Sequence, residues 1–322
     1  MTRVHQQVEA VLGASAGGER AGSVARDWYA LAKPGIVKMV VVTAGVGFAL
    51  AAMTRVWAGP ELLTTAMLCL LGTALSAAGA NALNMAVEAR RDAAMHRTMR
   101  RPIAAGRMTV AHGLWAGAGC AAAGVAVLWL GTNPVAALVS AVTVLSYVLV
   151  YTPMKPMTPL ATLVGAVPGA LPPLIGWASA SDGWWRGMNE PGGWALFALM
   201  FVWQVPHFLA IAWKYREDYA RGGHAVLAVV DPTGVRTAWT AMVWAVAMVP
   251  VSLAPVMAMP GRIGLVYVVI ATAAGVGFVW SAVRFARTLA ERDARALFLG
   301  SIAYLPVVLV ALVCDAAVTR LL

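Results

Sequence analysis

The sequence predicts an all-α integral membrane protein, built as a bundle of nine transmembrane helices. Hydrophobic residues make up 61% of its 322 residues and charged residues only 12%, whereas a soluble domain carries about 25% charged residues. The mean hydropathy is +0.75. The apolar runs are continuous and do not alternate with polar residues, which favours helices over a membrane β-barrel.

The chain begins with a polar segment, residues 1–35, and we expect the membrane domain to occupy residues 36–322. The polar segment has no apolar stretch of the kind found in a cleaved signal peptide. It contains three acidic residues, which are unusual in a transit peptide, so a bacterial plasma membrane is favoured over an organelle. Trp28 and Tyr29 are expected to lie at the membrane interface.

Nine apolar segments follow, each close to the ~20 residues that a helix needs to span a bilayer. A short Gly-Thr-Asn-Pro turn joins the third segment to the fourth. The predicted segments cover residues 36–54, 62–84, 110–131, 133–152, 158–179, 193–213, 237–258, 263–283 and 296–317.

The lysines and arginines predict the orientation of the bundle. Of the 24 in the chain, only Arg55, Arg186, Arg262 and Arg320 fall on one side. The others lie in the polar segment, at Lys38 near the start of the first apolar segment, and in the loops after the second, fourth, sixth and eighth apolar segments. The positive-inside rule therefore places the N-terminus in the cytoplasm and the C-terminus outside. The net charge of +10 reflects this orientation, and we expect no nucleic-acid partner.

A charged segment follows the second apolar run. Asn84, Glu88 and Asp92 are spaced four residues apart, so on a helix they lie along one face. Arg97 and Arg101 come after them. The carboxylates can hold a hard cation and the guanidinium groups can hold phosphate. A solvated loop with arginines that extend to the membrane surface is the alternative.

A second cluster of acids and bases follows the sixth apolar run, where Lys214, Glu217 and Asp218 leave the membrane. The predicted orientation puts this cluster on the same side as the first. Two such clusters can close over one diphosphate and its metal ions. Two unrelated solvated loops are the alternative.

The fifth apolar segment is rich in residues that distort a helix, namely Gly165, Pro168, Gly169, Pro172 and Pro173. Distorted backbone at membrane depth is found only where it is buried in protein or lines a cavity. This segment therefore predicts a cavity inside the bundle.

Polar residues in the fourth and sixth segments are further candidates for a functional site. Tyr151 and Lys155 mark the cytoplasmic end of the fourth segment, although a lysine is also a common membrane anchor there. Gln204 and His207 have apolar neighbours in the sixth segment, and polar residues at membrane depth are functional candidates. A hydrogen-bonded structural histidine is the alternative for His207.

Taken together, these motifs resemble the UbiA superfamily of intramembrane prenyltransferases, and most closely its haem-modifying branch. The family's first motif, Asn-x-x-x-Asp-x-x-x-Asp, is matched by residues 84–92 with Glu88 at its middle position. The further matches are Arg-Thr at 97–98, Arg-Pro-x-x-x-Gly at 101–106, YTPMKPMTP at 151–159, VGAVPGALPPLIGWA at 164–178, WQVPHF at 203–208 and KYREDYARGG at 214–223.

The resemblance implies an activity and a set of site residues. It implies a central cavity open to the cytoplasmic side, where a farnesyl group passes from farnesyl diphosphate to a vinyl group of haem b. The product would be haem O for a terminal oxidase, with Mg²⁺ as the cofactor. The implied metal ligands are Asn84, Glu88, Asp92 and Asp218. The implied catalytic residues are these four with Lys155 and Lys214. The implied substrate-binding residues are Lys33, Lys38, Arg97, Arg101, Tyr151, Gln204, His207 and Glu217.

The chain departs from the family pattern in places. Glu88 keeps the charge of the usual aspartate and lengthens its reach by one methylene. The charged loop after the sixth apolar segment contains no complete Asp-x-x-x-Asp motif. Whether Glu217 or Asp218 binds the metal therefore stays open on the sequence. Ala225 and Ala228 stand where proline is common. These changes concern the geometry of the metal site more than membership of the family.

Three other functions stay open on the sequence alone. The first is prenyl transfer to another aromatic or tetrapyrrole acceptor. The second is a non-catalytic membrane protein that binds or transports haem. The third is a secondary transporter, which usually carries charges near the membrane midplane, whereas the acids here lie at helix ends. The expected partners are farnesyl diphosphate, haem b, the lipid bilayer, and haem A synthase or terminal oxidase assembly proteins. The expected location is a bacterial inner membrane.

Overall fold

The computed structural model describes residues 24–181, 183 and 185–321, so most of the predicted polar segment lies outside the described residues. Within these ranges every regular element is a helix, and nine helical spans are long and apolar enough to cross a membrane. This confirms the predicted all-α bundle. The spans are α2 (Pro34–Ala52), α3 (Glu61–Val87), α5 (Val110–Gly131), Pro134–Met154, Ala161–Ala180, α11 (Pro191–Lys214), α14 (Val235–Ala258), α15 (Leu265–Thr288) and α16 (Glu291–Leu321).

The fifth span consists of two helices, α8 (Ala161–Ala170) and α9 (Pro172–Ala180). The helix breaks at Leu171 because Pro172 and Pro173 have no amide hydrogen to donate to the preceding turn. This confirms the distortion predicted from the prolines.

The fourth span contains a π-helical turn that the sequence analysis did not predict. It consists of α6 (Pro134–Leu145), η1 (Ser146–Tyr151) and α7 (Thr152–Met154). Pro153 cannot donate to the carbonyl group one turn earlier, and the amide of Thr152 donates to Tyr147, five residues back. The rings of Tyr147 and Tyr151 lie 5.5 Å apart.

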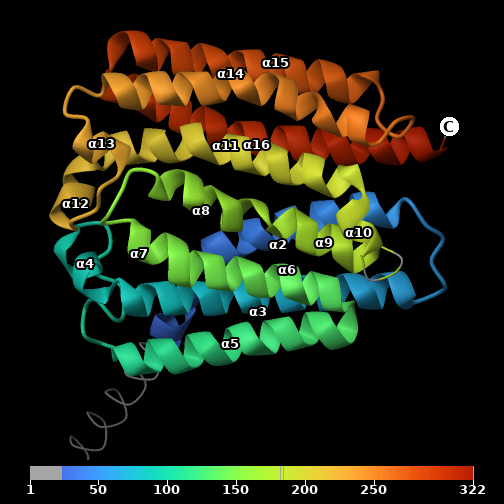
Figure 1. Cartoon of the computed structure of the whole chain (residues 1–322), viewed down its shortest axis with the longest axis horizontal. Helices are drawn as coiled ribbons and strands as arrows, with labels where there is room; N and C mark the ends of the chain where they lie inside the picture. Colours follow the sequence, from blue (N-terminus) through green and yellow to red (C-terminus); the bar gives the residue numbers. More distant parts are fainter. Residues whose placement is uncertain (1–23, 182, 184, 322) are drawn as a thin grey trace, which may run out of the picture.

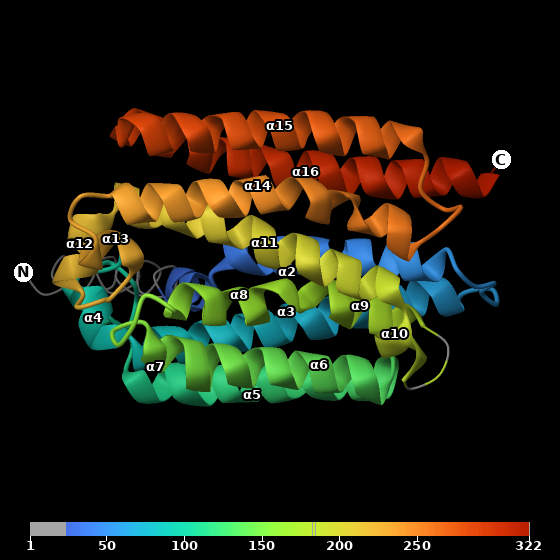
Figure 2. The ribbon, with the colours of Figure 1, turned by 45° about the horizontal axis from the view of Figure 1, so that its top comes forward.

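The short helices separate the two ends of the bundle (Figures 1 and 2). Helices α4 (Ala89–Ala94), α12 (Arg216–Arg221) and α13 (Leu227–Val230) gather at one end, on the left of both views. Helix α10 (Arg186–Asn189) and the last turn of α16 lie at the other end. The two charged loops therefore share one side, as predicted.

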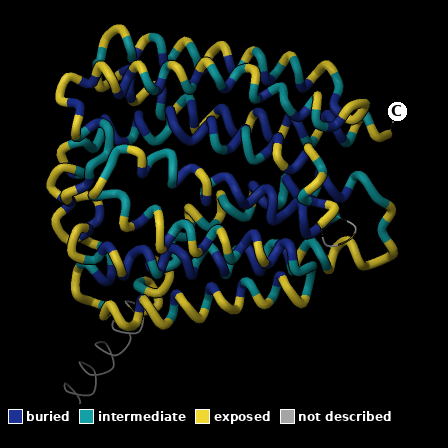
Figure 3. The backbone as a smooth tube through the Cα atoms, in the orientation of Figure 1, coloured by how far each residue is buried: buried dark blue, intermediate teal, exposed yellow. Residues whose placement is uncertain are grey.

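Buried residues fill the middle of the bundle and exposed residues line the outer helices, especially α5 and α15 (Figure 3). Many exposed side chains are apolar, such as Leu130 and Met257, as expected for a surface that faces lipid. Glycine allows close helix contacts inside the bundle. A Cβ on Gly176 of α9 would overlap the carbonyl oxygen of Ala44 on α2.

The last span begins earlier than predicted, at Glu291 and not at residue 296. The prediction followed the apolar run, but the first turn of α16 is charged. Acidic side chains near a helix N-terminus interact favourably with the helix dipole. Asp293 also accepts hydrogen bonds from Thr288 at 2.7 Å and from Arg284 at 2.8 Å, which stabilises this additional turn.

Candidate active site

Asn84 is the centre of a buried polar cluster at the end of α3. Its side-chain oxygen accepts a hydrogen bond from Lys33 Nζ at 2.8 Å. Its amide nitrogen donates to Glu88 Oε2 at 2.8 Å and to Thr152 Oγ1 at 3.0 Å. Asn84 therefore joins three segments of the chain, the start of α2, the end of α3 and the start of α7.

Lys33 is held in an unusual backbone conformation at the start of α2. Its φ of 51° lies in the left-handed region, which costs a side-chain-bearing residue roughly 1–2 kcal/mol. Burial, followed by the nearby charges of Arg101 and Lys155, lowers the pKa of its ammonium group to about 7. Such strain is found at functional sites when the surrounding structure imposes it.

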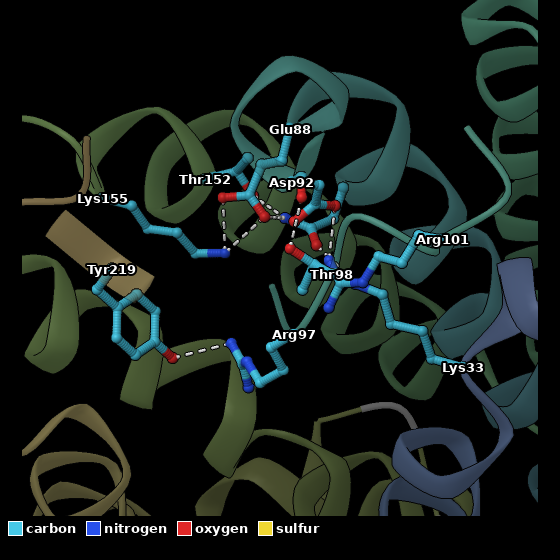
Figure 4. A network of polar contacts seen from close by, with 10 residues as sticks. Lys33, Glu88, Asp92, Arg97, Thr98, Arg101, Thr152, Lys155 and Tyr219 are labelled. Carbon is cyan, nitrogen blue, oxygen red and sulfur yellow. Dashed lines mark hydrogen bonds and ion pairs between the residues drawn. The ribbon is translucent and has the colours of Figure 1, made fainter. Parts of the chain in front are cut away.

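Glu88, which accepts a hydrogen bond from Asn84, forms an ion pair with Lys155. This ion pair is drawn in Figure 4. The Glu88 side chain is only 6% exposed, and Lys155 Nζ lies 2.9 Å from Oε1 and 3.0 Å from Oε2. Burial raises the pKa of this carboxyl, but the charges of Lys155 and Lys33 outweigh burial and hold the pKa below its ordinary value. Glu88 is therefore a carboxylate in the folded protein.

Asp92 lies one turn beyond Glu88 and is 1% exposed. Helix α3 ends at Val87, but the amide of Glu88 donates to Asn84 at 2.9 Å and that of Asp92 to Glu88 at 2.8 Å. The helical hydrogen-bond pattern thus continues through the junction with α4. Arg101 Nη1 donates to Asp92 Oδ2 at 2.6 Å.

Asp218 connects the second loop to the first. Its oxygens accept hydrogen bonds from the backbone amides of His96 at 3.1 Å and Arg97 at 3.0 Å. Burial raises the pKa of Asp218, but these two bonds and the charge of Arg221 hold it below its ordinary value. Arg97 makes a second link between the loops, because its guanidinium group donates to Tyr219 Oη at 3.2 Å.

The site contains more cations than anions. Lys33, Arg97, Arg101 and Lys155 surround Glu88 and Asp92 (Figure 4). The excess of positive charge suits a ligand with several negative charges, and arginine and lysine are the usual side chains for phosphate.

An apolar cavity of about 370 Å³ lies inside the bundle next to this cluster. Tyr151 and Gly165 line the end near the cluster, while Thr73, Ser140 and Ile175 line the far end. Along α3 the cavity lining runs from Thr73 to Asn81, which is about 12 Å of helix at 1.5 Å per residue. The predicted site residues Tyr151, Gln204 and His207 all line it.

Gln204 and His207 are both held by hydrogen bonds on the cavity wall. Gln204 Nε2 donates to the carbonyl oxygens of Met200 at 3.0 Å and Ala166 at 3.3 Å. The Nδ1 atom of His207 lies 2.7 Å from Ser301 Oγ. The histidine does not bond the carbonyl oxygen that Pro206 leaves without an amide partner.

Three predicted site residues lie at the edge of this arrangement. Lys38 and Glu217 are exposed. Lys214 is half-buried, with Nζ 5.0 Å from the centroid of the Tyr215 ring. Among the residues that the structure describes, none of these three side chains bonds a member of the Asn84 cluster.

Two residues of the site were missed in the sequence analysis. Thr152 is buried and accepts the hydrogen bond from Asn84, and the only signal was its position next to Tyr151. His224 is 4% exposed, and its Nδ1 has no hydrogen-bond partner in the described part of the chain. The pKa of His224 lies below its ordinary value, because the effect of burial outweighs the opposing charge of Glu88.

The donor atoms fit a hard cation such as Mg²⁺. Asn84, Glu88 and Asp92 offer only oxygen atoms as ligands, and Glu88 Oε1 is buried without a hydrogen bond of normal geometry. Among the described residues, no three His, Cys, Asp or Glu side chains are grouped closely enough to hold an ion alone. Mg²⁺ in proteins commonly uses one or two carboxylates with water and phosphate oxygens.

Comparison with known proteins gives a family match over most of the chain. The model of the UbiA prenyltransferase family matches residues 40–305. The protoheme IX farnesyltransferase of Solibacter usitatus (strain Ellin6076) is 40% identical over 289 residues, covering 88% of this chain and 96% of the relative. That of Anaeromyxobacter sp. (strain Fw109-5) is 42% identical over 289 residues, with coverages of 89% and 93%.

Solved structures share the fold at low sequence identity. A digeranylgeranylglyceryl phosphate synthase superposes with a TM-score of 0.73 at 14% identity, covering 90% of this chain and 98% of the other. A UbiA homologue from Archaeoglobus fulgidus, bound to GPP and Mg²⁺, superposes with a TM-score of 0.53 at 11% identity. It covers 92% of this chain and all of the other.

Proposed function

The chain belongs to the UbiA prenyltransferase family, and we propose that it transfers a farnesyl group from farnesyl diphosphate to a vinyl group of haem b, giving haem O for a terminal oxidase. One structural observation supports this function most strongly. A buried cluster of cations and carboxylates lies at one end of an apolar cavity. A prenyl diphosphate has the same two parts, a charged head and an apolar chain.

The cluster binds the diphosphate in this proposal. Lys33, Arg97, Arg101 and Lys155 contact its oxygens, and Lys38, Lys214 and Glu217 act from the edge of the site. Asn84, Glu88, Asp92 and Asp218 would hold Mg²⁺, which neutralises charge on the leaving diphosphate. The complex of a UbiA homologue with GPP and Mg²⁺ supports this choice of metal.

The same cations also stabilise the ligand-free site. Arg101 is paired with Asp92 and Lys155 with Glu88, so the buried carboxylates are not left as uncompensated charges. When diphosphate binds, these two cations are already within reach of it. Fixed charges of this kind stabilise the leaving group without reorganisation.

The reaction forms one carbon–carbon bond. Breaking the allylic carbon–oxygen bond releases diphosphate and leaves an allylic cation. The terminal carbon of the haem vinyl group attacks this cation, and the positive charge moves to the adjacent carbon. Water adds there and loses a proton to the diphosphate, which gives the hydroxyl group of haem O. Tyr147 and Tyr151 line the cavity, and their aromatic rings stabilise the cation in this proposal.

The cavity wall orients the two substrates. Its apolar side chains enclose the prenyl chain and keep water from the cation before the new bond forms. Gln204 and His207 contact the haem. The end of the bundle with α4 and α12 faces the cytoplasm of a bacterium, and the site opens to that side of the inner membrane. The likeness of the chain to bacterial enzymes of this activity supports the location.

A reconstituted assay tests the function. Purified protein in lipid nanodiscs is incubated with haem b, farnesyl diphosphate and Mg²⁺, and the pigments are separated and weighed by mass spectrometry. We expect a product with the mass of haem O, and its loss when Mg²⁺ is chelated. Haem that binds but is recovered unchanged would indicate a haem-binding protein. Transfer only to another aromatic acceptor would indicate a different prenyltransferase.

A further inference from the structure

His207 lies in the cavity wall on α11, and aromatic rings hold its imidazole. The Trp203 ring stacks on it at a centroid distance of 4.8 Å and an angle of 21°. The Phe298 ring from α16 lies 5.3 Å away. These neighbours fix the plane of the imidazole but leave open which nitrogen carries the proton.

Ser301 on α16 is the hydrogen-bond partner of His207 Nδ1. Its hydroxyl oxygen lies 2.7 Å from His207 Nδ1. The same hydroxyl donates to the carbonyl oxygen of Phe298 at 2.6 Å, which uses the one hydrogen that a serine side chain has to donate. When the serine hydrogen is used in that bond, the serine oxygen can only accept from His207, which requires the imidazole proton on Nδ1.

Ser301 is itself held firmly. It is fully buried, and its carbonyl oxygen accepts a hydrogen bond from Trp203 Nε1 at 2.8 Å. The two residues of α11 that stack on each other, Trp203 and His207, are thus both bonded to one residue of α16. These contacts between α11 and α16 fix the position of the serine hydroxyl relative to the imidazole.

The other nitrogen of His207 is available to a ligand. Nε2 has no hydrogen-bond partner in the described part of the chain, and His207 lines the cavity. With the proton on Nδ1, Nε2 has a free lone pair. Histidines that bind metals usually have this arrangement, in which the second nitrogen donates to a fixed oxygen.

We propose that Ser301 is a positioning residue that keeps His207 protonated on Nδ1, so that the Nε2 lone pair binds the iron of the haem substrate. This proposal rests on the proposed function and adds a residue of the last helix to the site. A histidine and serine that only pack α11 against α16 would form the same hydrogen bond, but the tautomer would then have no effect on haem.

Haem binding is measured first, by absorbance titration of the protein in nanodiscs with haem b and without farnesyl diphosphate. Ser301→Ala removes the acceptor for Nδ1 and is expected to weaken haem binding about ten-fold or more. Ser301→Thr keeps the hydroxyl group and is expected to bind haem like the wild type. Ser252→Ala is the matched control, because Ser252 is equally buried and its hydroxyl donates to the carbonyl oxygen of Val249 on α14, outside the cavity lining.

The tautomer is measured separately in the ligand-free protein. Nitrogen-15 NMR of histidine-labelled protein distinguishes a protonated ring nitrogen from an unprotonated one, and loss of a signal in His207→Gln assigns it. We expect Nδ1 to be protonated in the wild type and in Ser301→Thr, and a mixture of tautomers in Ser301→Ala. The wild-type spectrum decides the tautomer even if Ser301→Ala does not fold.

Two results would overturn the proposal. One is a wild-type His207 protonated on Nε2. The other is a haem affinity in Ser301→Ala, or in His207→Gln, equal to that of Ser252→Ala. If either is found while haem O is still formed, only the positioning role fails. If haem binding and the tautomer behave as expected but no haem O is formed with any substrate, only the proposed function fails.

Discussion

Glu88 and Lys155 are 67 residues apart in the chain, yet Lys155 Nζ lies within 3.0 Å of both carboxylate oxygens of Glu88. Only the bond to Oε2 has hydrogen-bond geometry, so Oε1 is held by charge alone. Glu88 therefore keeps one buried carboxylate oxygen that can accept a metal ion, and Lys155 supplies the compensating charge in its absence. Substitutions at position 88 can separate the effect of charge from that of shape.

We expect Glu88→Asp to retain farnesyl transfer and Glu88→Gln to lose it. Aspartate keeps the negative charge and shortens the reach by one methylene, whereas glutamine keeps the shape and leaves Lys155 beside a neutral amide. The loss in kcat is expected to be about a hundred-fold or more, because a metal ligand contributes several kcal/mol of charge stabilisation.

Glu61→Gln is the matched control for this pair of variants. Glu61 also forms an ion pair, with Arg55 at 2.6 Å, but at the opposite end of α3 and half exposed. It should transfer farnesyl like the wild type. Equal activity in Glu88→Gln and Glu88→Asp would mean that the charge at this position is not used.

We expect Asp92→Asn to abolish transfer while the bundle stays folded. Asparagine can still accept the hydrogen bond from Arg101, so the fold loses little, but the metal loses a carboxylate ligand. Asp293→Asn is the control, because Asp293 is likewise buried, at 2% exposed, and pairs with Arg284 at 2.8 Å, away from the cavity. Turnover and melting temperature are compared for both, and near-normal turnover in folded Asp92→Asn would remove Asp92 from the metal site.

We expect Asp218→Ala to loosen the contact between the two loops, lowering the free energy of unfolding by about 2 kcal/mol for its hydrogen bonds. The pKa of Asp218 is depressed in the folded protein. Its contribution is therefore present above the ordinary aspartate pKa of about 3.9 and is lost as the pH falls through the depressed value. The thermal stabilities of wild type and Asp218→Ala should differ at pH 7, and the difference should shrink as the pH falls below about 4. A constant difference across this range would contradict a role for the charge.

Much of the fold could be predicted because it depends on properties that are local in sequence. Each membrane span follows from the length of an apolar run, and the break at Leu171 follows from two neighbouring prolines. The side shared by the two charged loops follows from the lysine and arginine distribution alone. The spacing of Asn84, Glu88 and Asp92 predicted one helical face, and the structure keeps that face through a helix junction.

The partners of the site residues could not be predicted, because they come from distant parts of the chain. Nothing near Asp218 in the sequence indicates that its oxygens accept the amides of His96 and Arg97. The burial of His224 depends on the packing of the second loop, although the loop itself is polar. The π-helical turn forms because the amide of Thr152 donates to the carbonyl oxygen of Tyr147, five residues back, and not to the one four residues back. The spacing of apolar residues does not distinguish these two bonds.

The length of the cavity predicts which prenyl chains the protein accepts. Thr73 lines the end farthest from the charged cluster, roughly 16 Å along α3 from Asn84 at 1.5 Å per residue. Thr73→Leu removes the hydroxyl group and lengthens the side chain by one non-hydrogen atom, which shortens the space for the last isoprene unit. We expect this variant to favour geranyl over farnesyl diphosphate, with the ratio of their kcat/KM values shifted about ten-fold or more. Such a shift corresponds to fewer than two buried methylenes at ~0.8 kcal/mol each. Thr272→Leu on α15 is the control, because it makes the same replacement at a position outside the cavity lining. Product masses are compared with both diphosphates, and an unchanged preference in folded Thr73→Leu would mean that the far end of the cavity does not hold the end of the prenyl chain.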